Sequence, residues 1–392
     1  MPGERLTRED VISVYRQLLG RDPGEDEVAH QLATLTTLDE LLRVALDSAE
    51  YAARLDAGQR PPTPSRPIVN IHHLDLEEWG HPVGTRSDDG IAIVGRGGWL
   101  FLCGGTNANL GQYVGAVEME PTWLEEWRAI VRSREQAVRE LGVTTALLVV
   151  PDKLAVYEES YPEPLTRAGL RPVERLLEAG DLPILYPLDE LRAAAREEPV
   201  YLRTDTHLTF RGNEVLFESV RETLGVAAPV DLSSTAVTCY PAFGDLGVKF
   251  DPPVVGIVTS PGTLGQARIV EDNRDQIAAV SGHIGTRRVF RNDAAPDRRA
   301  AVLFGDSFGF SAEHYQGLSW FMAQVFREVH FVWVPFGWDA DYVRRTGAEV
   351  VLVQGAERFV ARVPRPSVGV AALAEETLRR KQALGFDAAF EG

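Results

Sequence analysis

From residue 90 onward the chain alternates between short apolar segments and helix-like segments. The apolar segments are rich in β-branched side chains, which is typical of strands buried on both faces of a sheet. The clearest are TTALLVVP, LPILYPL, AAVLFG, VHFVWVP and EVVLVQG. Helix-like segments such as PTWLEEWRAIVRSREQAVRELG and SAEHYQGLSWFMAQVF stand between them. This alternation predicts an α/β fold, in which a mostly parallel sheet is flanked by helices.

The residues before this alternation have a different pattern. Short segments with apolar residues at helical spacing predict a small all-α domain over residues 1–57. A proline-rich linker is expected over 58–67, followed by a catalytic domain over 68–392. Within that domain, residues 226–290 are richer in Gly, Pro and Thr and less periodic, so we interpret them as an insertion or an irregular β segment.

Composition excludes several classes of function. The formal net charge of −17 argues against nucleic acid and against an anionic membrane surface, because both attract basic proteins. The 2 cysteines cannot form a disulfide framework. The N-terminal segment MPGERLTRED lacks the apolar core of a secretory signal, and no apolar run approaches the roughly 18 residues of a membrane helix. A cytoplasmic location is the resulting expectation.

Ser307 is the first candidate for chemistry. It lies in AVLFGDSFGFS, directly after a predicted strand and shortly before helix-like sequence. A strand, a turn and a helix in this order can lift a serine hydroxyl out of a sheet edge. Gly305 gives the chain room to turn, and N–H groups at the start of the following helix could stabilise an oxyanion. Serines near tight turns are common and usually inert, so a base is also needed.

The segment YLRTDTHLTFRGNE provides the best candidate base. VYLRT is predicted to be a strand, and Asp205 and His207 follow at its end. The Asp205 carboxylate can accept a hydrogen bond from Nδ1 of His207, which leaves Nε2 free to take a proton. A helix-capping aspartate beside a solvated histidine is the simpler alternative. The pair could also supply two metal ligands, but no further cluster completes a coordination shell, so we predict no metal.

Five motifs in order along the chain resemble the alginate O-acetyltransferase family of the SGNH/GDSL hydrolase superfamily, in which the usual order of motifs is circularly rearranged. They are GRGGWLFL, VVPDKLAVYEESYPEPL, RTDTHLT, LFGDSF and VLVQGAERFV. Leu208 replaces the tryptophan that the family usually has after its Asp-Thr-His motif. The N-terminal helices resemble a small module found beside glycosyltransferases and other glycan-building enzymes.

The resemblance implies that Ser307 is the nucleophile, His207 the base and Asp205 its partner. Arg358 would anchor the acyl donor or the glycan, although a salt bridge after the last strand is an equal alternative. Lys153 follows a predicted strand and either lines the same sheet edge or is a surface lysine. Three further residues are candidates for the pocket, as polar donors or, in the last case, as a stacking surface for a sugar ring: Asn109, Tyr315 and Trp338.

These observations predict a serine-dependent O-acyltransferase that acts on a carbohydrate or a glycosylated metabolite. Acetyl is the simplest acyl group, and acetyl-coenzyme A would be a donor in the cytoplasm, with no bound cofactor. The same residues would also serve an esterase or glycan deacetylase, if water reaches the acyl-enzyme first. A catalytically silent glycan-binding scaffold is the third alternative. In each case the N-terminal module could dock a protein of glycan biosynthesis.

Overall fold

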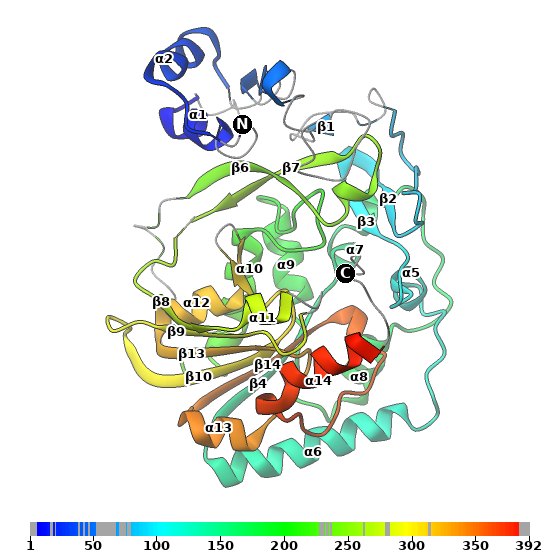
Figure 1. Ribbon diagram of the computed structural model, residues 1–392. Helices are drawn as coiled ribbons and strands as arrows, with labels where there is room; N and C mark the ends of the chain where they lie inside the picture. Colours follow the sequence, from blue (N-terminus) through cyan, green and yellow to red (C-terminus); the bar gives the residue numbers. More distant parts are fainter. Residues whose placement is uncertain are drawn as a thin grey trace.

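The chain folds around one large mixed sheet, seen edge-on in the computed structural model (Figure 1). No helix among the described residues is both long and apolar enough to cross a bilayer. The structure describes residues 6–15, 19, 21–37, 40–41, 44–45, 48–51, 68–69, 76, 80–226, 232, 235, 237–261, 263–278, 283–312 and 315–383.

The large sheet has the strand order β5-β4-β14-β10-β13-β9-β8. The first five strands are parallel to one another; at one edge β9 pairs antiparallel with β13, and β8 pairs antiparallel with β9. In chain order the strands are β4 (Thr144–Val150), β5 (Ile184–Leu185), β8 (Arg268–Asp272), β9 (Arg287–Arg291), β10 (Asp297–Gly305), β13 (Phe326–Trp333) and β14 (Val350–Ala356).

Both faces of this sheet are covered by helices, which explains why the buried parts of its central strands are mostly apolar. Along β10, Ala301 and Leu303 face one core and Val302 and Phe304 face the other, as the two-residue period of a strand requires. One core is closed by α7 (Lys153–Val156), α9 (Leu188–Ala195), α10 (Phe210–Arg221) and α12 (Leu318–Val325). The other is closed by α6 (Trp123–Leu141), α8 (Pro172–Ala179), α13 (Ala340–Thr346) and α14 (Val370–Ala383). The predicted α/β fold is therefore confirmed.

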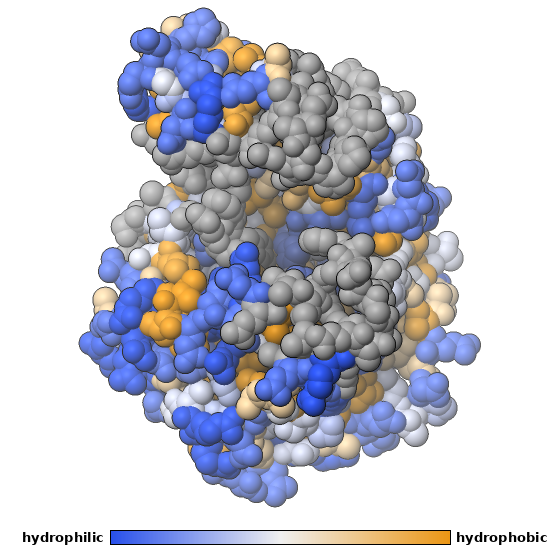
Figure 2. All heavy atoms as spheres, in the orientation of Figure 1, coloured by the Kyte–Doolittle hydropathy of each residue, from blue (hydrophilic) through white to orange (hydrophobic). Residues whose placement is uncertain are grey.

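A second, smaller sheet stands apart from the large one. It has the order β1-β7-β6 and consists of β1 (Ile68–Val69), β6 (Thr238–Phe243) and β7 (Val254–Ser260). The first two helices, α1 (Arg8–Val14) and α2 (Glu25–Thr34), form their own small core, and α1 packs against β6. Figure 1 shows these helices at the end of the molecule beyond β6 and β7, and Figure 2 shows a hollow between this part and the large sheet.

The remaining described elements are short. They are β2 (Ala92–Val94) and β3 (Leu100–Leu102), which form a hairpin, α5 (Asn109–Tyr113), α11 (Arg274–Ala278), and β11 (Ser311–Ala312) and β12 (Tyr315–Gln316), which pair with each other. Four single-turn 3-10 helices complete the described elements: η3 (Arg96–Gly98), η4 (Glu158–Ser160), η5 (Gly247–Lys249) and η6 (Glu357–Phe359).

The secondary structure agrees with the sequence in most places and differs in three. All five predicted strands are present in the large sheet. The segment VYLRT is not a strand, because Tyr201 forms only an isolated bridge with Leu208. The predicted helix over SAEHYQGLSWFMAQVF begins only at Leu318. Residues 226–290 divide between both sheets, since β6 and β7 lie in the small one and β8 and β9 in the large one. The predicted linker at 58–67 lies outside the described residues.

Candidate active site

Three adjacent parallel strands end in polar side chains at the same edge of the large sheet. The turn after β10 carries Asp306 and Ser307, and the neighbouring β14 is followed by Glu357 and Arg358. The next strand, β4, leads to Asp152 and Lys153. The carboxyl ends of parallel strands are where open α/β folds place their binding and catalytic groups. The predicted position of Ser307 at the end of a strand is confirmed.

The turn that carries Ser307 is held by the buried carboxylate of Asp306. Its Oδ1 accepts hydrogen bonds from the backbone N–H of Phe308 (3.0 Å) and from Nε2 of Gln354 (2.8 Å). Its Oδ2 accepts one from the backbone N–H of Ala356 (2.7 Å). Ser307 itself is half-buried, and neither its hydroxyl nor its backbone N–H has a hydrogen-bond partner among the described residues. Asp306 therefore fixes the turn and leaves the serine available.

Gly305 does not serve as the flexible point that the sequence suggested. It is the last residue of β10 and is not among the residues with positive φ. A Cβ at this position would lie 2.5 Å from Oε1 of Gln354, which also accepts the backbone N–H of Asp306 (3.1 Å). Glycine is needed here because Gln354 approaches the backbone closely.

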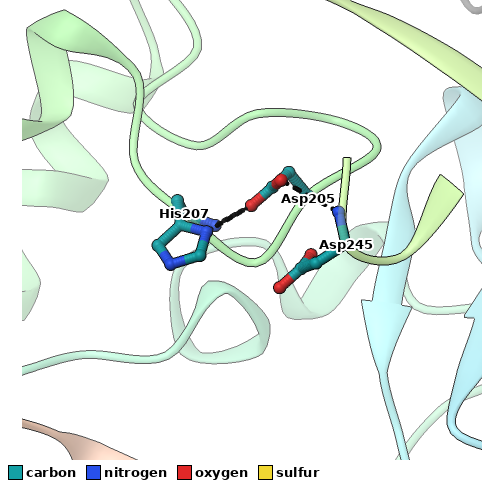
Figure 3. Close-up of side chains that lie close together, drawn as sticks. All are labelled: Asp205, His207 and Asp245. Carbon is teal, nitrogen blue, oxygen red and sulfur yellow. Dashed lines mark hydrogen bonds and ion pairs between the residues drawn. The ribbon is translucent and has the colours of Figure 1, made fainter. Parts of the chain in front are cut away.

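Asp205 and His207 form the predicted pair. Nδ1 of His207 lies 2.5 Å from Oδ1 of Asp205, and the same oxygen accepts the backbone N–H of His207 at 2.8 Å. The other ring nitrogen, Nε2, points away from the Asp205 carboxylate (Figure 3). Both side chains are mostly buried, with exposed fractions of 17% for Asp205 and 22% for His207. A carboxylate on Nδ1 fixes the tautomer in which Nε2 can accept a proton.

The residue after Ser307 joins the strand-end groups to this pair. The Phe308 ring lies with its centroid 5.5 Å from that of the His207 ring. Cζ of Arg358 lies 5.4 Å from the centroid of the same Phe308 ring. The imidazole, the guanidinium and the serine turn therefore gather around one buried aromatic side chain. No hydrogen bond joins Ser307 to the imidazole in this structure; catalytic hydrogen bonds of free enzymes often tighten only with substrate bound.

The Asp205–His207 loop is held by the connection between β6 and β7, a segment that the sequence analysis missed. The carbonyl of Thr204 accepts the backbone N–H groups of Leu246 (3.2 Å) and Gly247 (2.9 Å). The backbone N–H of Asp245 donates to Oδ2 of Asp205 at 2.9 Å. In return, the Asp245 carboxylate accepts the backbone N–H of Thr206 at 2.7 Å and also its hydroxyl.

Two glycines allow this close approach. A Cβ at Gly244 would lie 2.0 Å from the Thr204 carbonyl oxygen, and one at Gly256 would lie 2.2 Å from the Thr204 hydroxyl. Any larger residue would push the 244–256 segment away from the loop. The loop is therefore positioned by residues about forty positions later in the chain, rather than by a strand of its own.

The charges around His207 decide its protonation. Burial alone would lower the pKa of His207, but the Asp205 carboxylate, with a smaller contribution from Asp245, outweighs burial and raises it. Burial opposes ionisation of Asp205 too, yet the imidazole and its hydrogen bonds hold the pKa of Asp205 well below its usual value. Burial and the nearby Asp205 raise the pKa of Asp245. Arg358 acts on His207 in the opposite direction and lowers its pKa.

Asp245 also adds a third potential metal ligand. Ligand atoms of Asp205, His207 and Asp245 all lie within 4.8 Å of one another. The Asp205–His207 hydrogen bond already occupies one such atom on each residue, and Thr206 donates to both oxygens of Asp245. These contacts suit an imidazole that transfers protons.

Lys153 is buried, which contradicts the alternative of a surface lysine. Its Nζ donates to the carbonyls of Leu202 (2.9 Å) and Arg203 (3.1 Å), just ahead of the Asp205–His207 loop. The side chain is 5% exposed, and burial lowers the pKa of Lys153 to about 7 against the opposing effect of Asp245 and Asp205. Lys153 therefore supports the backbone that leads into the Asp205–His207 loop.

Arg358 makes the salt bridge that the sequence left as an alternative. Its Nη1 donates to Oδ1 of Asp152 at 2.6 Å, and both side chains are 10% exposed. The preceding residue, Glu357, accepts hydrogen bonds from the Asp152 backbone, from Arg171 and from Tyr186. Asp152 and Glu357 lie inside two of the motifs that resemble the family, and both also follow strand ends, but the sequence analysis did not single them out.

Of the three other predicted pocket residues, Trp338 and Asn109 do not fit their expected roles, and the role of Tyr315 stays a prediction. The indole of Trp338 is 3% exposed and packs into the core beside Phe304, so it offers no face to a sugar ring. Asn109 is 5% exposed, and its Nδ2 donates to the carbonyl of Leu102 at 3.1 Å. Tyr315 lies in β12, and its side chain is outside the part that the structure describes.

The predicted oxyanion donors at the start of the next helix are also wrong. The first N–H groups of α12 are already bonded to the serine turn: Leu318 donates to the Phe308 carbonyl and Ser319 to the Gly309 carbonyl, both at 3.0 Å. These bonds fix the turn against the helix. The start of α12 therefore supports the turn that carries Ser307, and these N–H groups are already occupied.

Comparison with known proteins gives the family. Residues 92–334 match the family described as SGNH hydrolase-like domain, acetyltransferase AlgX. The chain belongs to this family. The match includes the hairpin, the Asp205–His207 loop and the Ser307 turn, and the SGNH-like fold expected from the motifs is confirmed. The resemblance of the N-terminal helices to a glycosyltransferase-associated module stays a prediction, as does the circular rearrangement.

Solved structures similar to this AlgX-family chain are distant in sequence. The O-acetyltransferase domain of Pseudomonas putida AlgJ is 17% identical, with a TM-score of 0.44 over 73% of this chain and 99% of that one. Bacillus cereus PatB1, solved with a sulfonyl adduct, is 14% identical, with a TM-score of 0.47 over 70% of this chain and 95% of that one. A DHHW family protein from Eubacterium siraeum is 16% identical, with a TM-score of 0.46 over 72% and 96% of the two chains. No curated protein matches the chain.

The position of Asp245 makes a prediction about pH. In an Asp245→Asn variant the backbone N–H to Asp205 is kept, but a negative charge near His207 is lost. With Asp205 and Arg358 unchanged, the pKa of His207 should fall. Because a base must be neutral to accept a proton, the acid limb of the pH profile of kcat/KM should move to lower pH. Rates with an acetyl ester across the pH range would measure this shift.

The matched control is Asp341→Asn, which removes an exposed carboxylate paired with Arg344. Its profile should superimpose on that of the unmodified chain. An acid limb in Asp245→Asn that stays in place or moves to higher pH would contradict the assigned role of this charge.

Proposed function

We propose that this AlgX-family chain is a serine-dependent O-acetyltransferase that modifies a hydroxyl group of a carbohydrate or of a glycosylated metabolite. The observation that carries the proposal is the hydrogen-bonded Asp205–His207 pair, packed against the residue next to Ser307. Membership of an acetyltransferase family supports acetyl as the acyl group. The unbonded hydroxyl of Ser307, on a turn fixed by Asp306, supports its role as the nucleophile.

The first half of the reaction would form an acetyl-serine. Oγ of Ser307 attacks the carbonyl carbon of the acetyl donor while Nε2 of His207 takes the hydroxyl proton. The resulting tetrahedral oxyanion collapses, and the bond to the leaving alcohol or thiol breaks as the imidazolium returns its proton to that group. Asp205 stays ionised throughout and stabilises the imidazolium. An ester or a thioester such as acetyl-coenzyme A would meet these requirements.

The second half transfers the acetyl group to the acceptor. His207 removes a proton from an acceptor hydroxyl, whose oxygen attacks the carbonyl carbon of the acetyl-serine. A second tetrahedral oxyanion forms and collapses, and His207 protonates Oγ of Ser307 as the ester bond to the enzyme breaks. If water takes the place of the acceptor, the products are acetate and free enzyme. Transfer therefore requires that a bound acceptor reach the acetyl-serine before water does.

One experiment tests the nucleophile and the acetyl transfer. The chain is incubated with 4-nitrophenyl acetate, with and without a mixture of neutral oligosaccharides, and both acetate and acetylated sugar are measured. Labelling by a serine-reactive sulfonyl fluoride, located by peptide mass spectrometry, identifies the nucleophile. We expect labelling at Ser307, and acetylated sugar at the expense of acetate when oligosaccharide is present.

The alternative outcomes would each overturn part of the proposal. Acetate release that no oligosaccharide reduces would identify an esterase with the same catalytic groups. Absence of both labelling and acetate release would favour a catalytically silent scaffold. The cytoplasmic location and the docking of a partner by the N-terminal module are not addressed by this experiment and stay predictions.

A further inference from the structure

The backbone around Ser307 offers fewer oxyanion donors than such sites usually provide. The N–H of Phe308 donates to the Asp306 carboxylate, and that of Gly309 donates to the Asp306 carbonyl, both at 3.0 Å. The N–H groups of Leu318 and Ser319, at the start of α12, are also occupied. Among the described residues on this turn, the N–H of Ser307 itself remains without a partner. A tetrahedral oxyanion needs at least one more donor from outside the turn.

Arg358 is a mostly buried cation that has more hydrogen-bond donors than partners among the described residues. Its side chain is 10% exposed, and its Nη1 donates to Asp152 at 2.6 Å. The guanidinium carries five N–H groups, and the others have no hydrogen-bond partner among the described residues. The unpaired nitrogens of Arg358 are not among the fully enclosed polar atoms of the described residues, so a group that enters the site can reach them. An arginine kept in this state is prepared for an acceptor that arrives with the substrate.

The position of Arg358 brings those donors to the serine turn. It follows β14, which lies parallel and next to β10, so both residues stand at the ends of neighbouring strands. The guanidinium of Arg358 lies over the Phe308 ring. The backbone carbonyl of Arg358 accepts a hydrogen bond from Nε2 of Gln112 at 2.9 Å. The Asp152 bond fixes one side of the planar fork. The guanidinium is therefore held in one orientation before substrate binds, which is the preorganisation that an oxyanion site requires.

We propose that Arg358 donates, together with the backbone N–H of Ser307, to the oxyanion that forms in both halves of the reaction. This inference rests on the proposed function. It assigns a catalytic role to Arg358, whereas the family resemblance implies only that Arg358 anchors the acyl donor or the glycan. The same two donors serve both steps, because the oxyanion forms on the same carbonyl oxygen each time. Negative charge that develops on that oxygen meets a fixed positive charge.

The surrounding charges keep Arg358 cationic. Burial acts to lower the pKa of Arg358, but the carboxylates of Asp152 and Asp306 outweigh this effect and raise it. The paired carboxylate of Asp152 compensates the buried charge when no substrate is present. This explains how a guanidinium can be nine-tenths buried and still reserve most of its donors.

The test compares kcat and KM for 4-nitrophenyl acetate in Arg358→Gln and Arg358→Lys with the unmodified chain. An oxyanion donor acts in the transition state, so we expect kcat to fall by about 10²–10³-fold in Arg358→Gln while KM changes by less than about threefold. Arg358→Lys keeps the charge without the planar fork and should recover part of that loss. The control is Arg299→Gln, at the opposite end of β10, where the arginine pairs with Asp297; its kinetics should not change.

A folding defect would be separated from a catalytic one by the double variant Asp152→Asn/Arg358→Gln, which removes both buried charges. It should melt close to the unmodified chain and show the same loss of kcat. An unchanged kcat in Arg358→Gln, or a loss confined to KM, would overturn the inference. The proposed function fails separately, if Ser307 in the unmodified chain is neither labelled by the sulfonyl fluoride nor needed for acetate release.

Discussion

Replacing Ser307 with alanine should lower acetyl transfer by at least about 10⁴-fold, because the acetyl-serine can no longer form. The fold should be preserved, since the side chain is half-buried and its hydroxyl has no hydrogen bond to a described residue. The free energy of unfolding should change by less than about 0.5 kcal/mol. Steady-state rates with 4-nitrophenyl acetate and urea denaturation of the same preparation would measure both quantities.

Two comparisons make this result specific. The double variant Ser307→Ala/His207→Gln should be no slower than Ser307→Ala alone, because the two residues act in one step and their losses do not add. Ser219→Ala, which removes a hydroxyl that donates to the Leu216 carbonyl within α10, should keep full activity. Activity of Ser307→Ala within tenfold of the unmodified chain would mean that another group is the nucleophile.

The part of the site that the sequence predicts best is the part carried by the large sheet. Residues 300–304 of β10 and 350–353 of β14 are buried on both faces of the sheet, so they form short apolar runs that can be recognised directly. Where such a run stops, the next polar residues must lie at the sheet edge. This reasoning indicates Ser307, and it would also indicate Asp306 and the Glu357–Arg358 pair, because they occupy the same positions; in the sequence analysis Arg358 comes from the family resemblance.

Contacts between distant segments explain what the sequence could not predict. The Asp205–His207 loop was interpreted as the end of a strand, whereas it is held by Asp245 and the backbone beside it. Gly244 and Gly256 are needed only because Thr204 approaches them from elsewhere in the chain. The glycine-rich and weakly periodic sequence of residues 226–290 therefore indicates an irregular segment. In the structure, two of its glycines allow close packing around the loop of the candidate base.

The sequence pattern also gave a wrong prediction for Trp338, whose role depends on whether its side chain is buried. Trp338 follows β13 closely, and a tryptophan near a strand end is a reasonable candidate for contact with a sugar. The chain turns inward at this point, because the Asp339 carboxylate caps α13 and also accepts the backbone N–H of Val370. That turn packs the indole beside Phe304. Nothing in the spacing of the sequence distinguishes these two outcomes.

Replacing Asp306 with alanine should have the largest effect on stability of any substitution at the site, about 3–5 kcal/mol. The carboxylate is 2% exposed and satisfies three donors, from Phe308, Gln354 and Ala356, that would be left unpaired where little water can reach them. It also ties the serine turn to the end of β14. Urea denaturation would measure the loss, with the slope of the transition showing that one cooperative unit still unfolds.

Catalysis should fall in the same variant even where it remains folded, because the turn that carries Ser307 loses its attachment to β14. A displacement of about 1 Å at the reacting atoms can cost about 10²-fold in rate.

The Asp306→Asn variant separates the loss of stability from the loss of activity. It keeps an acceptor for the backbone N–H of Phe308 but turns an N–H₂ group toward a donor. The asparagine variant should therefore lose less stability than the alanine variant and still lose activity. Asp293→Asn, at an exposed carboxylate paired with Arg268, is the control and should change neither quantity. A loss below about 1 kcal/mol in Asp306→Ala would mean that water replaces the carboxylate, and that the position of Ser307 does not depend on it.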